Sequence, residues 1–320
     1  MKYAYFSRAI FISWFCSIRD CKFCYLSSKE NQSPIKDRRS LPSILAEALV
    51  CKAHGWPIEF ISGGCDTYKS HELANIIEKI YEITGQKQWL NLGVLDERKL
   101  KMFKPYIDGI TGTVECLTPG LREFVVPSKP LDKIEGMFEI CDKLGIKKAI
   151  TFIVGLGETI DDFKHLEAFV KKHHVDRITM YRLKPVKGTY YENAKGPSSE
   201  YYLSWIRKTR EAFPSVELIA GMWLTHLDEV HLLFEAGADA VSKFPAIREF
   251  GTDHAFKIEE EAAKSGRKFQ GSLTRLTEID ADKELMFFEW DSELKGKIKE
   301  KLTQYIALME SNIPKPLPYS

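Results

Sequence analysis

The sequence contains no run of eighteen apolar residues, so no membrane-spanning helix is predicted. An excess of one charge sign is also missing. The 46 lysines and arginines face 45 acidic residues, and the resulting net charge of +1 indicates neither a nucleic-acid partner nor a membrane surface. Arg8 interrupts the apolar residues of the first fifteen positions, and no small-residue cleavage site follows, which argues against a secretion signal. We therefore expect a cytoplasmic protein.

Cysteines are few and unevenly spaced, with seven in 320 residues. An odd number in a reducing compartment favours metal ligands, catalytic groups or buried thiols over disulfides. The stretch "FCSIRDCKFCY" (15–25) places three of them, Cys16, Cys21 and Cys24, within nine positions. This spacing is too dense to be dismissed as incidental buried thiols, although that alternative remains open.

The sequence has no second CxxC and no HxxxH pair to complete a metal site of the commonest kind. A structural zinc site takes four ligands, typically in two pairs, so zinc is disfavoured but stays an alternative. A CxxC redox pair would leave Cys16 without a role. An iron–sulfur cluster with three protein thiolates would use all three cysteines and leave one iron open to a ligand.

Short β-rich runs alternate with amphipathic helical stretches along most of the chain. In residues 131–144, apolar side chains recur at spacings of three and four, as on one face of a helix, and Gly145 ends the pattern. No glycine-rich dinucleotide fingerprint follows the first expected strand, which weighs against a doubly wound open sheet. Eight strand–helix units predict an α/β fold, a (β/α)8 barrel. The expected strands are residues 9–15, 57–62, 88–94, 109–115, 148–154, 177–183, 215–221 and 238–244.

The alternation stops near residue 270. We expect a barrel over residues 1–270 and a C-terminal extension over 271–320 that packs on it. Residues 291–311 are predicted to form one helix and the "IPKPLPYS" end to be extended. The cysteines follow the first expected strand, which would place them at the C-terminal mouth of a barrel, where active sites of this fold are built.

The cysteine stretch resembles the signature of the radical S-adenosylmethionine (SAM) superfamily. Its usual spacing is C-x3-C-x2-C, with an aromatic residue before the third cysteine. Phe23 supplies the aromatic residue, whereas the first gap here is four residues. The resemblance continues in order over residues 8–245 and is closest to the biotin synthase branch. It implies a [4Fe-4S] cluster on Cys16, Cys21 and Cys24, and a radical SAM type of barrel.

Further motifs resemble the superfamily's SAM-binding segments. Gly63 and Gly64 in "ISGGCD" match a motif whose backbone binds the methionine amino group, and Glu115 matches a polar contact to the cofactor. "AITFIVGLGET" (149–159) resembles the GxIxGxxE segment, in which Ile153 would lie against adenine and Gly155 would complete the cofactor site, while Thr151 replaces the first glycine. The resemblance implies reductive cleavage of SAM to a 5′-deoxyadenosyl radical that abstracts hydrogen from an unactivated carbon.

The resemblance does not extend to biotin synthase's second, sulfur-donating cluster. The corresponding positions hold side chains that cannot replace its ligands: Ile61, Trp89, Ala149 and Met222. Cys65 and Cys116 instead each follow an expected strand. Either could be a small buried residue, or the two could belong to a different auxiliary cluster that serves catalysis by sulfur insertion. That possible second cluster would need a further ligand.

Among biotin-synthase-like enzymes, the pattern resembles the archaeal-type two-component lipoyl synthases. This implies an octanoyl chain on a lipoyl-carrier protein as substrate, a paralogous partner subunit and a separate electron donor. The alternatives are hydrogenase-cofactor maturases or amino-acid mutases without sulfur chemistry and, from another class, a metal-binding scaffold without turnover. Arg182 and Lys184 could reach a carboxylate or ribose, but surface ion pairs are the expectation. Asp253 and His254 are expected in a solvated loop.

Overall fold

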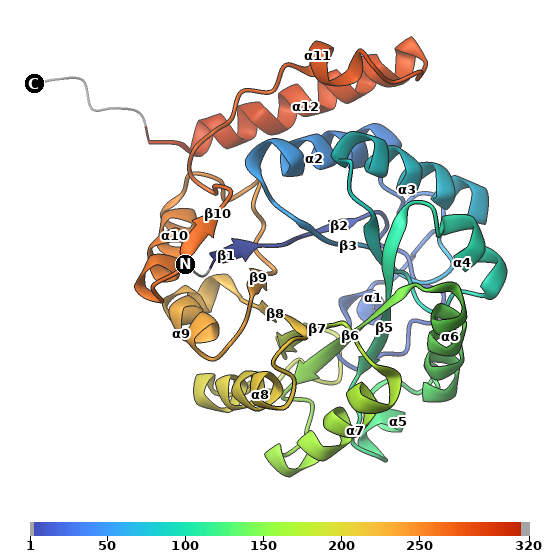
Figure 1. Ribbon diagram of the computed structural model, residues 1–320, viewed down its shortest axis with the longest axis vertical. Helices are drawn as coiled ribbons and strands as arrows, with labels where there is room; N and C mark the ends of the chain where they lie inside the picture. Colours follow the sequence, from blue (N-terminus) through green and yellow to red (C-terminus); the bar gives the residue numbers. More distant parts are fainter. Residues whose placement is uncertain (1–2, 315–320) are drawn as a thin grey trace, which may run out of the picture.

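The computed structural model describes residues 3–314, and its centre is one parallel β-sheet of ten strands (Figure 1). The strand order is β10-β1-β9-β8-β7-β6-β5-β4-β3-β2. The strands span Tyr3–Phe6 (β1), Arg8–Phe11 (β2), Ile58–Ser62 (β3), Gln88–Asn91 (β4), Ile107–Glu115 (β5), Lys147–Val154 (β6), Arg177–Arg182 (β7), Glu217–Gly221 (β8), Ala240–Ser242 (β9) and Lys268–Gln270 (β10).

The sheet curls into a barrel because β1 and β2 are two halves of one extended segment. Only Ser7 separates the two strands. Its N–H donates a hydrogen bond of 2.9 Å to the carbonyl of Val241 in β9. The next N–H, that of Arg8, donates to the carbonyl of Pro57 over 2.8 Å, on the β3 side. The first segment therefore joins both ends of the strand order, with β10 as an additional strand beside β1.

Helices surround the barrel on its outer face (Figure 1). The helix that the sequence predicts over residues 131–144 is present as α6, together with further long and short helices. Their bounds are Tyr25–Ser28 (α1), Leu41–His54 (α2), Ser70–Thr84 (α3), Glu97–Phe103 (α4), Leu121–Val125 (α5), Leu131–Leu144 (α6), Phe163–His173 (α7), Ser199–Ala212 (α8), Val230–Glu235 (α9), Asp253–Lys264 (α10), Ala281–Leu285 (α11) and Ser292–Asn312 (α12), with 3-10 turns at Ile160–Asp162 and Leu224–Glu229. The predicted (β/α)8 barrel is thus confirmed.

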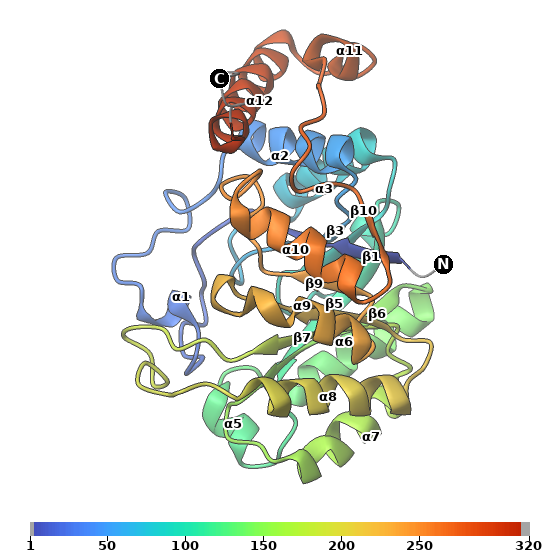
Figure 2. The same cartoon turned by 90° about the vertical axis from the view of Figure 1, so that its left-hand side faces the viewer.

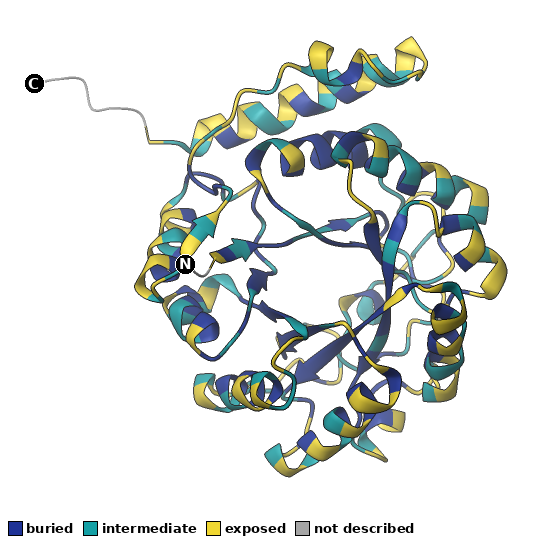
Figure 3. Ribbon diagram, viewed as in Figure 1, coloured by how far each residue is buried: buried dark blue, intermediate teal, exposed yellow. Residues whose placement is uncertain are grey.

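Alternation along the strands separates two apolar regions. On β6, Ile150 and Phe152 point to the helices, whereas Ala149 and Ile153 belong to a separate cluster that also contains Phe60 of β3. Successive side chains of a strand point to opposite faces, so each strand contributes to both regions. Figure 3 shows the strands as largely buried and the exposed residues on the outer helices.

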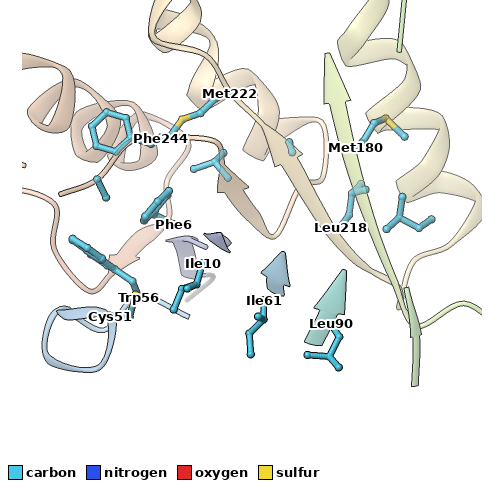
Figure 4. Close-up of a cluster of buried hydrophobic side chains, with 14 of the residues drawn as sticks. Phe6, Ile10, Cys51, Trp56, Ile61, Leu90, Met180, Leu218, Met222 and Phe244 are labelled. Atoms are coloured by element: carbon cyan, nitrogen blue, oxygen red, sulfur yellow. The ribbon is translucent and has the colours of Figure 1, made fainter. Parts of the chain in front are cut away.

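The outer core includes an aromatic group beside the first strand segment (Figure 4). The ring centroid of Phe6 lies 5.9 Å from that of Trp56 and 6.0 Å from that of Phe244, both in edge-on orientation. Such edge-to-face pairs are favourable beyond the area they bury. The contact of Phe6 with Phe244 holds β1 against the segment that follows β9.

The C-terminal helix α12 lies along α2 on the outside of the barrel (Figures 1 and 2). Ile298, Leu302 and Met309 are its buried side chains. The helix predicted at residues 291–311 is confirmed, whereas most of the "IPKPLPYS" end lies outside the described residues. The division of the chain at residue 270 stays a prediction. No helix within residues 3–314 has the length and apolar character needed to cross a membrane.

Candidate active site

A cavity of about 280 Å³ lies at the end of the barrel where the cysteine loop follows β2. Its wall combines residues from loops after several strands, as expected for the C-terminal mouth of a (β/α)8 barrel. Most site residues predicted from the sequence line it: Cys16, Cys21, Phe23, Cys24, Gly63, Gly64, Cys65, Glu115 and Ile153. The barrel therefore brings together residues that are up to 137 positions apart in the sequence, between Cys16 and Ile153.

Backbone contacts hold the cysteine loop in place. The N–H of Cys16 donates to Oε1 of Gln32 over 2.9 Å, and the N–H of Cys24 donates to the carbonyl of Cys21 over 3.2 Å. Lys22, between the last two cysteines, donates its N–H to Val125 over 2.9 Å. The longer first gap is accommodated by Arg19, which has φ of 55°, so the extra residue is absorbed in a turn.

The loop after β3 packs directly on the first cysteine. A Cβ added to Gly64 would lie 1.8 Å from the carbonyl oxygen of Phe15 and 2.6 Å from Cα of Cys16. Glycine is therefore required at this position by the close approach of two backbones. The neighbouring N–H of Ser17 donates to the carbonyl of Cys65 over 3.3 Å. The motif recognised in the sequence as a SAM contact thus also positions Cys16.

Cys65 lies beside Cys16 in this cavity. A hydrogen bond from the Cys65 thiol lowers the pKa of Cys16 to about 5, and the same bond raises the pKa of Cys65. A thiol whose pKa is depressed ionises readily, and the thiolate is the form that ligates metals. Among the three cysteines of the loop, Cys16 is the one whose pKa is lowered, because burial raises the pKa of Cys21 to about 11 and also raises that of Cys24.

Lys129 is a cavity residue that sequence reasoning missed. Its Nζ lies 3.9 Å from Oε1 of Glu115, and the side chains of the two residues are only 15% and 9% exposed. Burial lowers the pKa of Lys129, but its neighbours Cys21, Glu115, Cys65 and Cys24 outweigh this and raise the pKa. A buried cation beside several thiols offsets the negative charge they acquire on ionisation. No sequence motif marks Lys129, because it reaches the site from the loop after α5.

Glu115 ends β5 with φ of 59°, a left-handed conformation that is uncommon outside glycine. Its Oε2 accepts a hydrogen bond from Oγ1 of Thr151 over 3.2 Å. Burial raises the pKa of the Glu115 carboxyl. The side chain is therefore held inside the cavity wall, where it can accept hydrogen bonds from a bound ligand.

Two predicted site residues do not line the cavity. Cys116 is fully buried in the inner apolar cluster, which also contains the cavity residues Cys21 and Ile153. A Cβ on Gly155 would meet Pro197 at 2.6 Å, so this glycine serves packing in a loop. The carboxylate of Glu158 accepts backbone N–H groups from Gly155 at 2.5 Å and from Leu156 at 2.8 Å. The matched glycine and glutamate therefore shape the loop after β6.

Arg182 and Lys184 were expected in surface ion pairs, but the pair of Arg182 with Glu229 is buried, and Lys184 is exposed without an ion pair within residues 3–314; both residues line the cavity. Arg182 is 4% exposed, and its Nη2 lies 2.6 Å from Oε2 of Glu229, while its Nη1 has no partner within residues 3–314. Lys243, directly after β9, also lines the cavity. Arg182 and Lys184 lie at the end of β7 and Lys243 at the end of β9, so only the folded barrel reveals that these cations are neighbours.

The three loop thiols share a cavity but do not meet at a single ion. Within the described residues, no group of three His, Cys, Asp or Glu side chains is arranged to hold one metal ion. A [4Fe-4S] cube differs because it takes one thiolate at each of three irons. Three cysteines of one loop around a common cavity, with Lys129 as a buried counter-charge, fit this donor set.

Comparisons with known proteins agree with this geometry. A family model described as the radical SAM superfamily matches residues 10–170, about half of the chain. An uncharacterized protein of Methanocaldococcus jannaschii is 35% identical over 94% of this chain and 88% of its own length. Biotin synthases are more distant: that of Persephonella marina is 25% identical over 68% of this chain and 66% of its own length, and that of Methanococcus maripaludis C7 is 30% identical over 54% of each chain.

Solved structures show a similar fold at low identity. Methylornithine synthase (PylB) gives a TM-score of 0.65 at 18% identity, covering 75% of this chain and 72% of that one. The FeFe-hydrogenase maturase HydG of Carboxydothermus hydrogenoformans gives 0.66 at 18% identity, covering 97% and 81%. The family model, together with the cysteine cavity, leads to one conclusion: the chain belongs to the radical SAM superfamily.

Proposed function

We propose that this protein binds a [4Fe-4S] cluster through Cys16, Cys21 and Cys24 and cleaves SAM to start radical chemistry on an organic substrate. Membership of the superfamily implies the cluster and SAM. The observation that supports the residue assignment is the shared cavity, in which the three thiols face Gly64, Glu115 and Ile153. The reaction class, radical chemistry started by SAM cleavage, follows from the superfamily.

When bound, the cluster would supply the electron for the reductive cleavage of SAM to methionine and a 5′-deoxyadenosyl radical. The protein positions SAM and excludes water from the cavity. Gly63 and Gly64 offer backbone groups to the methionine end, while Glu115 accepts hydrogen bonds from the nucleoside part. Ile153 provides an apolar surface for adenine, and the enclosing barrel keeps solvent away from reactive species.

The proposal is tested by anaerobic reconstitution with iron and sulfide. About four iron atoms per chain are expected for one cluster, together with 5′-deoxyadenosine when SAM and dithionite are added. The Cys16→Ala variant should lose both signals. Cys141→Ala is the matched control, because Cys141 is fully buried on α6 and away from the cavity. Wild-type protein that binds iron but forms no 5′-deoxyadenosine would favour the metal-binding scaffold instead.

A second, finer candidate is sulfur insertion of the lipoyl synthase type, on an octanoyl chain carried by a partner protein. Two observations favour it: the curated relatives include biotin synthases, and a fourth cysteine, Cys65, lines the cavity. Cys116 lies outside the cavity wall, so it does not strengthen the case for a second cluster there. Such an enzyme would work with a paralogous partner subunit, a lipoyl-carrier protein and an electron donor in the cytoplasm.

Iron content separates this candidate from the maturase-like and mutase-like alternatives. Sulfur insertion with an auxiliary cluster requires about eight iron atoms per chain, whereas the alternatives need about four. The Cys65→Ala variant should then lose about half of the iron, and mass spectrometry of an octanoylated peptide should show added sulfur. Unchanged iron in Cys65→Ala together with no sulfur transfer would leave hydrogen abstraction without sulfur insertion as the function.

A further inference from the structure

A second cavity of about 880 Å³ adjoins the active-site cavity, and we call it the outer groove. The two share six wall residues, which form the junction between them: Phe11, Tyr25, Lys184, Val186, Trp223 and Lys243. The outer part of the groove is walled by residues of β1, α2, the segment after β9 and α12, such as Phe6, Ser43, Phe244, Lys301, Tyr305 and Leu308. The active site is therefore continuous with a larger space that reaches the C-terminal helix.

The groove follows an interruption in the barrel wall. β9 pairs with β1 at Tyr5 and Phe6, whereas β2 pairs with β3. Within residues 3–314, no strand pairing joins β2 to the segment after β9. Side chains span the gap instead: Nη1 of Arg8 donates to the carbonyl of Phe244 over 3.1 Å, and Nζ of Lys243 lies 5.7 Å from the ring centroid of Phe11. Side chains rather than a paired backbone thus define the passage.

Under the proposed function, the inner cavity is occupied by the cluster and SAM. Its 280 Å³ is bordered by all three cluster cysteines and by the residues matched to SAM binding, Gly64, Glu115 and Ile153. A volume of this size is at the lower end of those that hold one small organic ligand. The bulk of a substrate must therefore lie elsewhere, and the junction offers the route to the larger groove.

The groove combines an apolar wall with unpaired positive charge. Its lining carbon atoms belong largely to aromatic and aliphatic side chains, and Trp223 is held by a hydrogen bond from Nε1 to the carbonyl of Arg182 over 3.2 Å. Lys184, Lys243 and Lys301 have no carboxylate within ion-pairing distance in the described part of the chain. Each instead lies over an aromatic ring, that of Trp223 at 4.8 Å, Tyr181 at 4.3 Å or Tyr305 at 5.5 Å.

The groove offers little negative charge to balance these lysines. Glu47 is its lining carboxylate, and that side chain is already paired with Arg8 at 2.6 Å and with Arg39 at 2.5 Å. Cations over aromatic rings without acidic partners remain available to an anionic ligand. The charge and the apolar wall together describe a ligand with an apolar body and an anionic group.

We propose that the outer groove binds the substrate, and that the substrate is an elongated organic anion. This inference rests on the proposed function, because it takes the inner cavity to be the radical-generating site. The apolar chain lies between Phe11, Trp223 and Tyr305, and the anionic group pairs with Lys184 or Lys301. The chain thereby presents one of its carbon atoms at the junction. The C-terminal helix α12 then acts as part of the substrate site.

The test uses three probes of equal chain length: octanoate, octanamide and octylammonium. Binding to the anaerobically reconstituted protein with SAM is measured by calorimetry. Octanoate is expected to bind about tenfold or more tightly than octanamide, because only its charge is complementary to the lysines, and octylammonium should bind most weakly. Octanamide that binds as tightly as octanoate would overturn the proposal and favour a neutral chain linked to a carrier protein.

Two lysine variants locate the anion. Lys184→Gln and Lys301→Gln should bring the affinity for octanoate toward that for octanamide, in at least one of the two by about fivefold or more. Lys297→Gln is the matched control on α12, since Lys297 is exposed, pairs with Glu293 and does not line the groove. An octanoate affinity unchanged in both groove variants would contradict the assignment.

The same samples separate this inference from the proposed function. Formation of 5′-deoxyadenosine from SAM and dithionite without a groove ligand depends only on the inner cavity. It should proceed at equal rates in wild type and in the control variant Lys297→Gln, because Lys297 lines neither cavity. Its absence in wild type would refute the proposed function, whereas its presence without preference for octanoate would refute the substrate inference alone.

Discussion

Gly64 lies against the backbone of Cys16, so closely that a Cβ on the glycine would sit 2.6 Å from Cα of the cysteine. The neighbouring Gly63 is different, because its added Cβ would be 3.5 Å from Ile12 and Ser13, which is ordinary contact. Two adjacent glycines that look equivalent in the sequence therefore carry different steric constraints. The loop after β3 and the cysteine loop form one unit through Gly64.

The first prediction concerns this pair. Gly64→Ala should displace Cys16, lower the free energy of unfolding by about 1–3 kcal/mol and reduce the iron retained after reconstitution. Gly63→Ala should retain iron at the wild-type level. Iron and sulfide analysis of the two variants checks this, and equal iron contents would contradict the steric argument.

The second prediction concerns Glu59, whose Oε1 accepts a hydrogen bond from the hydroxyl of Tyr181 over 2.8 Å. Burial raises the pKa of its carboxyl. The native state then holds this proton to higher pH than the unfolded state does. The contribution of Glu59 to the free energy of unfolding therefore falls as the pH rises from the unfolded pKa through the raised native one. Glu59→Gln removes this dependence and should gain stability relative to wild type at higher pH.

The expected size is about 1.4 kcal/mol for each pKa unit by which the native value is raised. Urea unfolding at pH 5 and at pH 8 measures the difference between variant and wild type. Glu97→Gln is the control, because Lys101 lowers the pKa of that exposed carboxyl and the sign is then opposite. A Glu59→Gln variant with the same relative stability at both pH values would refute the assignment.

The third prediction concerns the buried pair of Arg182 and Glu229. Removing the carboxylate leaves a buried guanidinium without its charge partner, so Glu229→Ala should lower the free energy of unfolding by about 3 kcal/mol or more. Glu200→Ala, which breaks an exposed pair with Arg207, should change little. Chemical denaturation provides the comparison. Equal effects would show that Arg182 is more accessible to water than its 4% exposure indicates.

The fourth prediction concerns the attachment of α12. Leu302 is 3% exposed and belongs to the outer core, so Leu302→Ala should lower the free energy of unfolding by about 2–5 kcal/mol. Leu308 on the same helix is 42% exposed, and its truncation should cost less than about 1 kcal/mol. Hydrogen exchange of α12 amides should accelerate in the first variant. Unchanged exchange there would mean that other contacts hold the helix.

Local sequence patterns predicted much of this architecture. The eight strands, the main helices and the cysteine loop were predictable because each depends on periodicity or spacing within a short segment. β1 and β10 were not predicted, and in β10 the exposed Lys268 and Gln270 flank a half-buried Phe269, so no continuous apolar face marks this strand. Barrel closure through Ser7 depends on hydrogen bonds to distant residues, which a local pattern does not record.

Only part of the site was predicted, because contacts between residues far apart in the sequence leave no local pattern. Motif residues were found, but Lys129, Arg182 and Lys243 become neighbours only after the barrel closes. Cys116 was expected at the mouth because it directly follows a strand. Glu115, the last residue of β5, instead has a left-handed conformation, and Cys116 packs in the inner apolar cluster. A backbone conformation of this kind leaves no periodic signal in the sequence.

The gap in strand pairing between β2 and the segment after β9 affects how the substrate selectivity of such an enzyme could change. Residues 10–170, which match the superfamily model, contain the cysteine loop, whereas α12 lies beyond them. If the outer groove binds the substrate, substitutions of its α12 residues Lys301 and Leu308 would change that groove, whereas the cysteine loop lies on a separate segment. Selectivity and radical generation would then be separately adjustable properties of one chain.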